Sequence, residues 1–217
     1  MKIKLAAFFV ILFLTFLFTQ SVHATILITE ILADPPGDVN NDGVISSSQD
    51  EFMEILNTSD AEINLTGWSI RDAIGERHAF IANTILSPYA FFVVFGGGAP
   101  NLTDIDWQTA STGALGLNNS GDTITLRDFS GEIINSVTYG SEGNNNQSLT
   151  RFPEGANSEF VLHSSIPEAQ GRLYSPGTTI DGQRVLSSTV PEATTFLYIA
   201  LGWSMLILKR REKLLTK

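Results

Sequence analysis

A short segment near the start of the chain carries oxygen-bearing side chains at alternating positions. It reads Asp38-Val39-Asn40-Asn41-Asp42-Gly43-Val44-Ile45, with a carboxylate or amide at the first, third and fifth positions. A hard cation such as Ca²⁺ takes about six to eight oxygen ligands, and alternate residues of a tight loop can point theirs inward. Gly43 permits the sharp turn that such a loop needs. The spacing therefore predicts a calcium site.

The remaining ligands follow from the first part of an EF-hand-type calcium loop, which this spacing matches. Val44 would offer its backbone carbonyl at the seventh position, and Ser46 would hold a bridging water at the ninth. Gln49 stands at the twelfth position in place of a bidentate Glu, so Asp50 or Glu51 would close the site after a one-residue slip. A solvated acidic turn is the alternative interpretation. The candidate ligands are Asp38, Asn40, Asp42, Val44, Ser46, Asp50 and Glu51.

Catalytic groups are sparse. Between the two ends of the chain there are two histidines, His78 and His163, and the whole chain has no cysteine. A serine–histidine–aspartate arrangement could use His163, but no Gly-x-Ser-x-Gly sequence supports it. The His-Glu-x-x-His pattern of many zinc enzymes is absent too. We expect a protein without enzymatic activity, and a secreted hydrolase with an unrecognised site is the remote alternative.

The elements that must position these residues are short strands. Apolar runs recur between clusters of Gly, Asn, Asp, Ser and Pro, and several alternate with polar residues. No long window has the helical period of about 3.6 residues. The pattern predicts an all-β fold, a β-sandwich of one domain. The expected strands span residues 26–32, 52–56, 68–70, 91–95, 123–126, 133–139 and 160–162.

Several strand positions allow a more specific expectation. Glu30 and Glu54 alternate with apolar neighbours, so both are expected to face away from the core. Residues 91–95 are apolar on both faces, which indicates a central strand covered on both sides. The three glycines at 96–98 are expected to form a flexible turn after it. Arg151 is a candidate to pair with a carboxylate.

Charge is distributed unevenly along the chain. The whole chain has a net charge of -10, but residues 25–193 hold 22 Asp and Glu against six Arg and no Lys, a net charge of -16. Such an acidic surface repels nucleic acid and attracts cations. The lack of cysteine excludes a disulfide framework.

Residues 1–24 have the three parts of a secretory signal peptide. Lys2 and Lys4 precede an apolar run over residues 5–18, and Val22-His23-Ala24 fits a small-x-small cleavage site. Cleavage after Ala24 would place a mature chain beginning at Thr25 outside the cytoplasm. A retained membrane anchor is the alternative.

The other end of the chain predicts a transmembrane helix over residues 193–208, which are uncharged. At about 1.5 Å per residue it spans about 24 Å, slightly less than a bilayer core of about 30 Å. The basic cluster at residues 209–213 would remain in the cytoplasm. Residues 183–189 are expected to link domain and anchor. A buried amphipathic helix of the domain is the alternative.

Together, Val190-Pro191-Glu192, the apolar run and the basic end resemble a PEP-CTERM sorting signal over residues 190–217. Ala193 replaces the second proline of the family's Val-Pro-Glu-Pro motif. The resemblance implies processing by an exosortase-type membrane protease in a Gram-negative bacterium that makes exopolysaccharide. The chain would be anchored in the inner membrane first, and would then reach the cell surface or the extracellular matrix.

A second resemblance covers residues 25–182. Several separate pieces of this region are similar to a lamin tail domain, from its first strands to its closing elements. The similarity implies an immunoglobulin-like β-sandwich of secreted and surface proteins, which serves as a binding or accessory module. The pieces are residues 28–31, 50–57, 65–72, 121–126, 131–139, 148–151 and 175–177.

These observations favour a non-catalytic exported module that is stabilised by calcium and serves adhesion or association with extracellular polysaccharide. The alternative is an envelope protein–protein interaction module that binds its partner through sheet edges.

Overall fold

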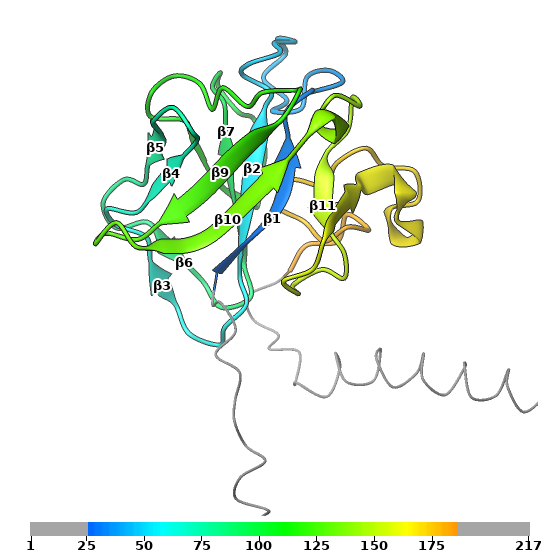
Figure 1. The fold of residues 1–217 in the computed structure, drawn as a ribbon. Helices are drawn as coiled ribbons and strands as arrows, with labels where there is room; N and C mark the ends of the chain where they lie inside the picture. Colours follow the sequence, from blue (N-terminus) through cyan, green and yellow to red (C-terminus); the bar gives the residue numbers. More distant parts are fainter. Residues whose placement is uncertain (1–25, 186–217) are drawn as a thin grey trace, which may run out of the picture.

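The computed structural model describes residues 26–185, which fold as a β-sandwich (Figure 1). One sheet has six strands, in the order β12 (Phe160–Leu162), β11 (Leu149–Arg151), β1 (Ile26–Leu32), β2 (Phe52–Asn57), β7 (Phe91–Phe95) and β8 (Asp106–Thr109). The second sheet has four strands, in the order β10 (Ile133–Tyr139), β9 (Asp122–Arg127), β4 (Ser69–Arg71) and β5 (Glu76–Ala79).

The remaining elements are short. β3 (Ile63–Asn64) pairs with β6 (Ile85–Leu86) in a two-stranded ribbon. Three 3₁₀-helices follow β10 and β12: η1 (Ser141–Gly143), η2 (His163–Ser165) and η3 (Pro167–Ala169). No α-helix occurs between residues 26 and 185.

The all-β prediction is confirmed, and each expected strand is present with bounds that differ by one residue at most. Five short strands are absent from the expected set: β3, β5, β6, β8 and β11. β8 reads Asp-Trp-Gln-Thr and has no buried residue. Because no face of this strand is buried, its sequence has no run of apolar residues that would predict a strand.

The hydrophobic core lies between the two sheets, where Ile28, Ile55, Ile70 and Leu126 are buried together. The opposite face of the six-stranded sheet is buried as well. There Phe52, Val93 and Phe95 form a second cluster under the loops that carry Leu102, Ile105 and Tyr174. β7 therefore contributes Phe92 and Val94 to one side and Val93 and Phe95 to the other, which confirms the prediction for residues 91–95.

A β-bulge in β1 determines which way its acidic residue points. Ile28 pairs with Ile55 and Glu30 pairs with Glu54, so Thr29 is the extra residue. Ile28 faces the core before the bulge and Ile31 faces it afterwards. Glu30 and Glu54 lie side by side on the face away from the core, as expected, and that face is covered by the segment around Ser175.

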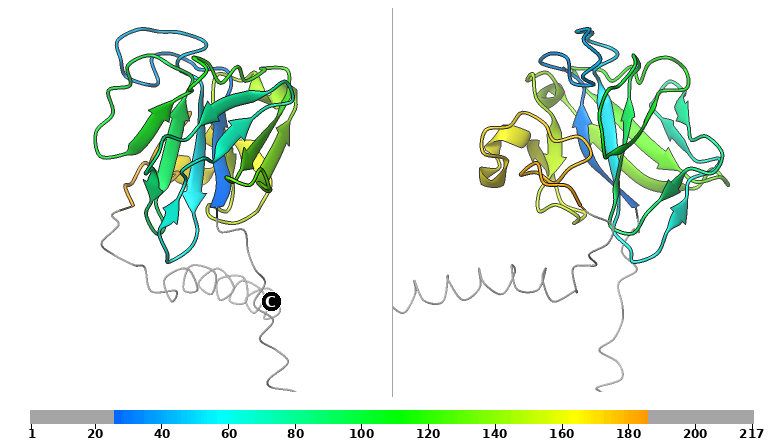
Figure 2. Two further views of the ribbon diagram at one scale, coloured as in Figure 1. Left: turned by 90° about the vertical axis from the view of Figure 1, so that its left-hand side faces the viewer. Right: turned by 180° about the vertical axis from the view of Figure 1, so that it is seen from behind.

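The loop between β1 and β2, residues 33–51, lies at one end of the sandwich (Figures 1 and 2). Both ends of the described chain lie at the opposite end (Figure 1). Residues 163–185 run beside β11 at the flank of the sandwich. The predicted signal peptide, sorting motif and transmembrane helix fall outside the described residues. Within residues 26–185, no helix has the length and hydropathy to cross a membrane.

Candidate functional site

The first half of the predicted calcium loop is a series of nested turns. Asp38 accepts hydrogen bonds from the backbone N–H groups of Asp42 (Oδ1, 3.1 Å) and Gly43 (Oδ2, 2.9 Å). Asn40 Oδ1 also accepts from Asp42 N–H at 3.0 Å. Asp42 Oδ1 accepts from Val44 N–H at 2.8 Å. The alternating spacing thus gathers three side-chain oxygen groups around one stretch of backbone.

Asp50 closes this loop from its far end. Its carboxylate is fully buried, and Oδ1 accepts from the N–H groups of Val39 (2.8 Å) and Asn40 (3.0 Å). Oδ2 accepts from Ser46 N–H at 2.8 Å. Both halves of the loop are therefore tied to one carboxylate.

Glu51 turns away from the loop, although it is the next residue. Its Oε2 accepts from the N–H groups of Gly116 (3.0 Å) and Leu117 (3.2 Å). Burial of this carboxyl raises its pKa to about 7, against the opposing effect of those two N–H donors. Asp50 and Glu51 were the two candidates for the last ligand of the loop. The structure brings Asp50 to the loop and directs Glu51 elsewhere.

The glycines at 96–98 form a wall of the loop. A Cβ at Gly98 would lie 2.3 Å from Asp42 Oδ2, and a Cβ at Gly96 would lie 1.9 Å from the Ser48 carbonyl oxygen. The Gly97 carbonyl accepts from Asn40 Nδ2 at 3.2 Å. This stretch is close-packed, where the sequence suggested only a flexible turn.

The donor set suits a hard cation. Asp38, Asp42 and Asp50 form no ion pair with a basic side chain anywhere in the part of the chain that the structure describes. Each carboxylate offers about four acceptor positions, so lone pairs remain beside the N–H contacts. Among residues 26–185, no three Asp, Glu, His or Cys side chains are grouped closely enough to hold a metal alone. A cation would therefore also need the Asn40 amide and backbone oxygens.

A second acidic cluster lies on the six-stranded sheet. Glu30 accepts from Ser148 Oγ (2.5 Å), Ser175 N–H (2.9 Å) and Ser175 Oγ (2.8 Å). Glu54 accepts from Thr29 Oγ1 and Gly177 N–H, both at 2.7 Å. Burial, and then the neighbouring Glu30, raise the pKa of Glu54 well above its usual value. These contacts fasten the C-terminal segment to β1 and β2.

Both described histidines are buried, which leaves neither in contact with solvent. His163 is 0% exposed; its Nδ1 lies 2.8 Å from Thr150 Oγ1 and 3.6 Å from Glu30 Oε1. His78 is 1% exposed, and burial lowers its pKa to about 4. A hydrolytic site built on His163 would have no access for a substrate.

Arg151 does not pair with a carboxylate, so that expectation is wrong. Its guanidinium donates to the carbonyl oxygens of Ile28 (2.7 Å) and Ser158. The guanidinium carbon Cζ lies 4.6 Å from the centre of the Phe160 ring. None of the ion pairs among residues 26–185 includes it. Backbone oxygens and an aromatic face take the place of the expected acid.

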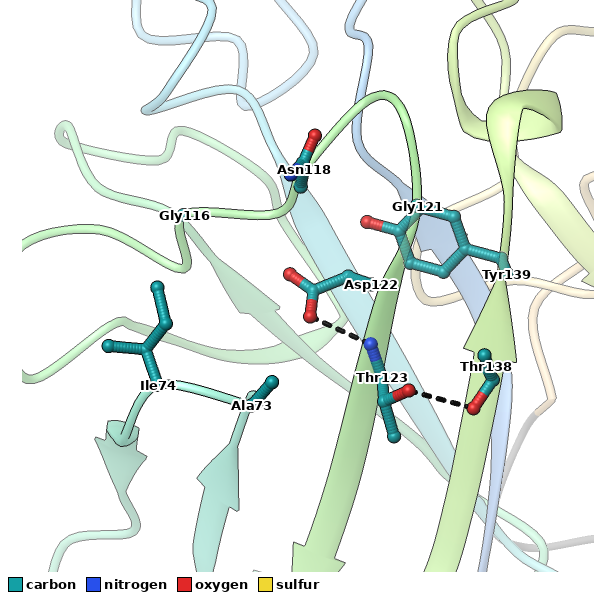
Figure 3. A pocket seen from close by; sticks show the side chains of 9 residues that line it. All are labelled: Ala73, Ile74, Gly116, Asn118, Gly121, Asp122, Thr123, Thr138 and Tyr139. Atoms are coloured by element: carbon teal, nitrogen blue, oxygen red, sulfur yellow. Dashed lines mark hydrogen bonds between the residues drawn. The ribbon is translucent and has the colours of Figure 1, made fainter.

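A cavity of about 460 Å³, which the sequence did not indicate, lies beside the four-stranded sheet, where β9 begins and β10 ends (Figure 3). Its lining combines the loop after β4, the loop before β9, and the facing ends of β9 and β10. Because these segments are far apart in sequence, no local pattern marks them. The lining includes Ala73, Ile74, Asn118, Asp122 and Tyr139.

The family comparison agrees with this architecture. The model of the lamin tail domain matches residues 19–141, which is more than half of the chain. The match covers β1 to β10 and ends before β11, so the C-terminal segment lies outside it. No curated protein matches the chain. Lamin tail domains are immunoglobulin-like structural and interaction modules, not typically enzymes. The chain belongs to the lamin tail domain family.

Proposed function

We propose that this chain is a non-catalytic, exported module of the cell surface or extracellular matrix, and that calcium stabilises its lamin tail domain. The loop between β1 and β2 carries the proposal. Its backbone N–H groups donate to the carboxylates of Asp38, Asp42 and Asp50, and none of the three has a basic partner among the described residues. Acidic side chains in one loop of a strongly acidic domain attract a cation.

In this proposal Ca²⁺ is held by Asp38, Asn40 and Asp42, with Asp50 closing the loop. The Val44 carbonyl and a water on Ser46 complete the set. Calcium sites of extracellular modules have dissociation constants of about 10⁻⁴–10⁻³ M, so a weak site would be filled outside the cell. Binding to the folded state alone would raise stability by mass action.

Export depends on the two ends of the sequence. Residues 1–24 act as signal peptide, and cleavage follows Ala24. Residues 193–208 hold the intermediate in the inner membrane until an exosortase-type protease processes it near Val190-Pro191-Glu192. Both ends of the described domain lie opposite the 33–51 loop (Figure 1). Extracellular polysaccharide is the proposed partner.

Fractionation of cells that produce the full chain tests this account. We expect the protein in the envelope and the medium, with Thr25 as its first residue. Replacement of Pro191 and Glu192 by alanine should retain the protein in the inner membrane. An intact chain that begins at Met1 and remains in the cytosol would contradict the proposal.

A further inference from the structure

The cavity beside β9 and β10 contains a buried polar group without a partner. Tyr139, the last residue of β10, is 4% exposed, and its hydroxyl makes no hydrogen bond with any residue that the structure describes. Burial raises the pKa of Tyr139, and the charges of Asp122 and Glu51 raise it further, against the opposing effect of the Asn118 backbone N–H. A buried hydroxyl without a partner destabilises the fold, so a ligand that pairs with it gains affinity.

Two further polar groups converge on the same space. Asp122 uses Oδ1 to accept from Thr123 N–H at 2.7 Å, and Oδ2 has no partner in the described part of the chain. Asn118 Oδ1 accepts from Ser120, whereas its Nδ2 donates to no described group. Figure 3 shows the Tyr139 hydroxyl directed toward Asn118, with the Asp122 carboxylate beside it.

The opposite wall of the cavity is apolar. Ile74 is 86% exposed and stands next to Ala73, across the cavity from Asp122 (Figure 3). An isoleucine this exposed is available to a ligand. The cavity thus pairs hydrogen-bonding groups on one side with a small apolar surface on the other, as ligand sites commonly do.

Hydrogen bonds fasten the segment that carries Gly116, a lining residue, to other parts of the domain. Gly116 and Leu117 are held by Glu51, the residue that directly follows the loop-closing Asp50. Asp34 accepts from Asn119 Nδ2 at 3.1 Å and from Asn146 N–H at 3.0 Å, which ties the neighbouring loops together. The start of β9 and the end of β10, which line the cavity, lie at the same end of the sandwich as the 33–51 loop (Figure 1).

We propose that this cavity is a binding site for a neutral sugar unit of a polysaccharide, with Tyr139 and Asn118 as donors, Asp122 as acceptor and Ile74 against the C–H face of the ring. Sugar hydroxyl groups both donate and accept, so one ring can satisfy all three polar groups. This inference rests on the proposed role as a module that associates with extracellular polysaccharide.

Charged ligands fit the cavity less well. A sulfated or uronic-acid sugar would place its anion beside Asp122, in a domain that is already strongly acidic. An ammonium group could pair with Asp122, but it has no acceptor for the Tyr139 hydroxyl or the Asn118 amide. A neutral ring with several hydroxyl groups can accept from Tyr139 and Asn118 and donate to Asp122.

The test is calorimetric titration of the full-length chain in detergent with cellohexaose, maltohexaose and mannohexaose. Tyr139→Phe removes the hydroxyl and retains the ring, and Asp122→Asn removes the charge. Matched controls are Tyr89→Phe and Asp128→Asn, which change the same groups outside the cavity. We expect at least one neutral hexasaccharide to bind, and each cavity variant to weaken it by about tenfold or more, while the controls bind as the parent does. Loss of a hydroxyl without a partner should not lower the melting temperature of Tyr139→Phe.

The remaining outcomes would overturn the inference. Equal binding by parent and cavity variants would place the site elsewhere and leave the proposed matrix association intact. Binding of hexagalacturonate or hexalysine, but of no neutral sugar, would refute the ligand class. If no hexasaccharide binds at millimolar concentration, the sugar site is refuted, whereas fractionation and calcium titration still decide the proposed function separately.

Discussion

Glu30 and Glu54 lie directly opposite each other on β1 and β2, and both side chains are buried against the C-terminal segment. Ser175 and Gly177 donate to these two carboxyl groups. The strands belong to the matched family region, whereas the donors follow its end at residue 141. In this chain the folded unit therefore extends beyond the family match.

Ser175→Ala should show that the C-terminal segment is part of the fold. The variant removes the hydroxyl that donates to Glu30 Oε2 and leaves a buried carboxylate oxygen with one donor fewer. We expect a loss of about 1–3 kcal/mol, which lowers the melting temperature by about 2–4 °C per kcal/mol. Ser130→Ala removes an exposed hydroxyl and is the control. Equal melting temperatures for both variants would show that the segment contributes little.

Glu51→Gln should change the pH dependence of stability. In the folded protein the pKa of Glu51 is raised from 4.5 to about 7. Between these values the folded state keeps a proton that the unfolded state has released, so this group's contribution to stability is lost as pH rises through about 7. Glutamine is neutral at every pH and can still accept from Gly116 and Leu117 through its amide oxygen.

The measurement is the melting temperature of Glu51→Gln minus that of the parent, taken at several pH values. We expect this difference to become more positive from about pH 5 to about pH 8. The titration of His78 is common to both proteins and cancels in the difference. Glu62→Gln, which makes the same change at an exposed position, is the control. A constant difference for Glu51→Gln as well would contradict the role of its burial.

Gly98→Ala should disturb the wall of the loop. Gly98 has a φ of +78°, and an added Cβ would collide with Asp42 Oδ2. Gly113 has a φ of +88° with nothing within 4 Å, so Gly113→Ala carries the backbone strain alone. That strain costs about 1–2 kcal/mol. Chemical denaturation should show Gly98→Ala to be the less stable of the two, and equal stabilities would mean that the glycine wall is not needed.

The fold could be predicted from the sequence wherever a side-chain pattern reports a strand face. Residues 91–95 are apolar at every position because both faces of β7 are covered, and residues 133–139 alternate because one face of β10 is open. The bulge at Thr29 could not be predicted, since it results from how β1 pairs with β2.

Part of the candidate site could also be predicted from a local side-chain pattern. Asp38, Asn40 and Asp42 are local in sequence, so their spacing reported the turns that bring them together. The divergence of Asp50 and Glu51 depends on the distant amides of Gly116 and Leu117. The unpaired Tyr139 hydroxyl likewise depends on packing between separate segments, which no local pattern encodes.

Calcium binding by the 33–51 loop can be measured by thermal melts of the protein in EDTA and in millimolar calcium. Calcium should raise the melting temperature of the parent and of Asp128→Asn, whose turn lies in the hairpin between β9 and β10 and resembles that of Asp38. It should leave the melting temperatures of Asp38→Asn and Asp42→Asn unchanged, because each lacks one of the proposed carboxylate ligands. The same melting temperature for the parent in EDTA and in calcium would contradict calcium binding by the loop.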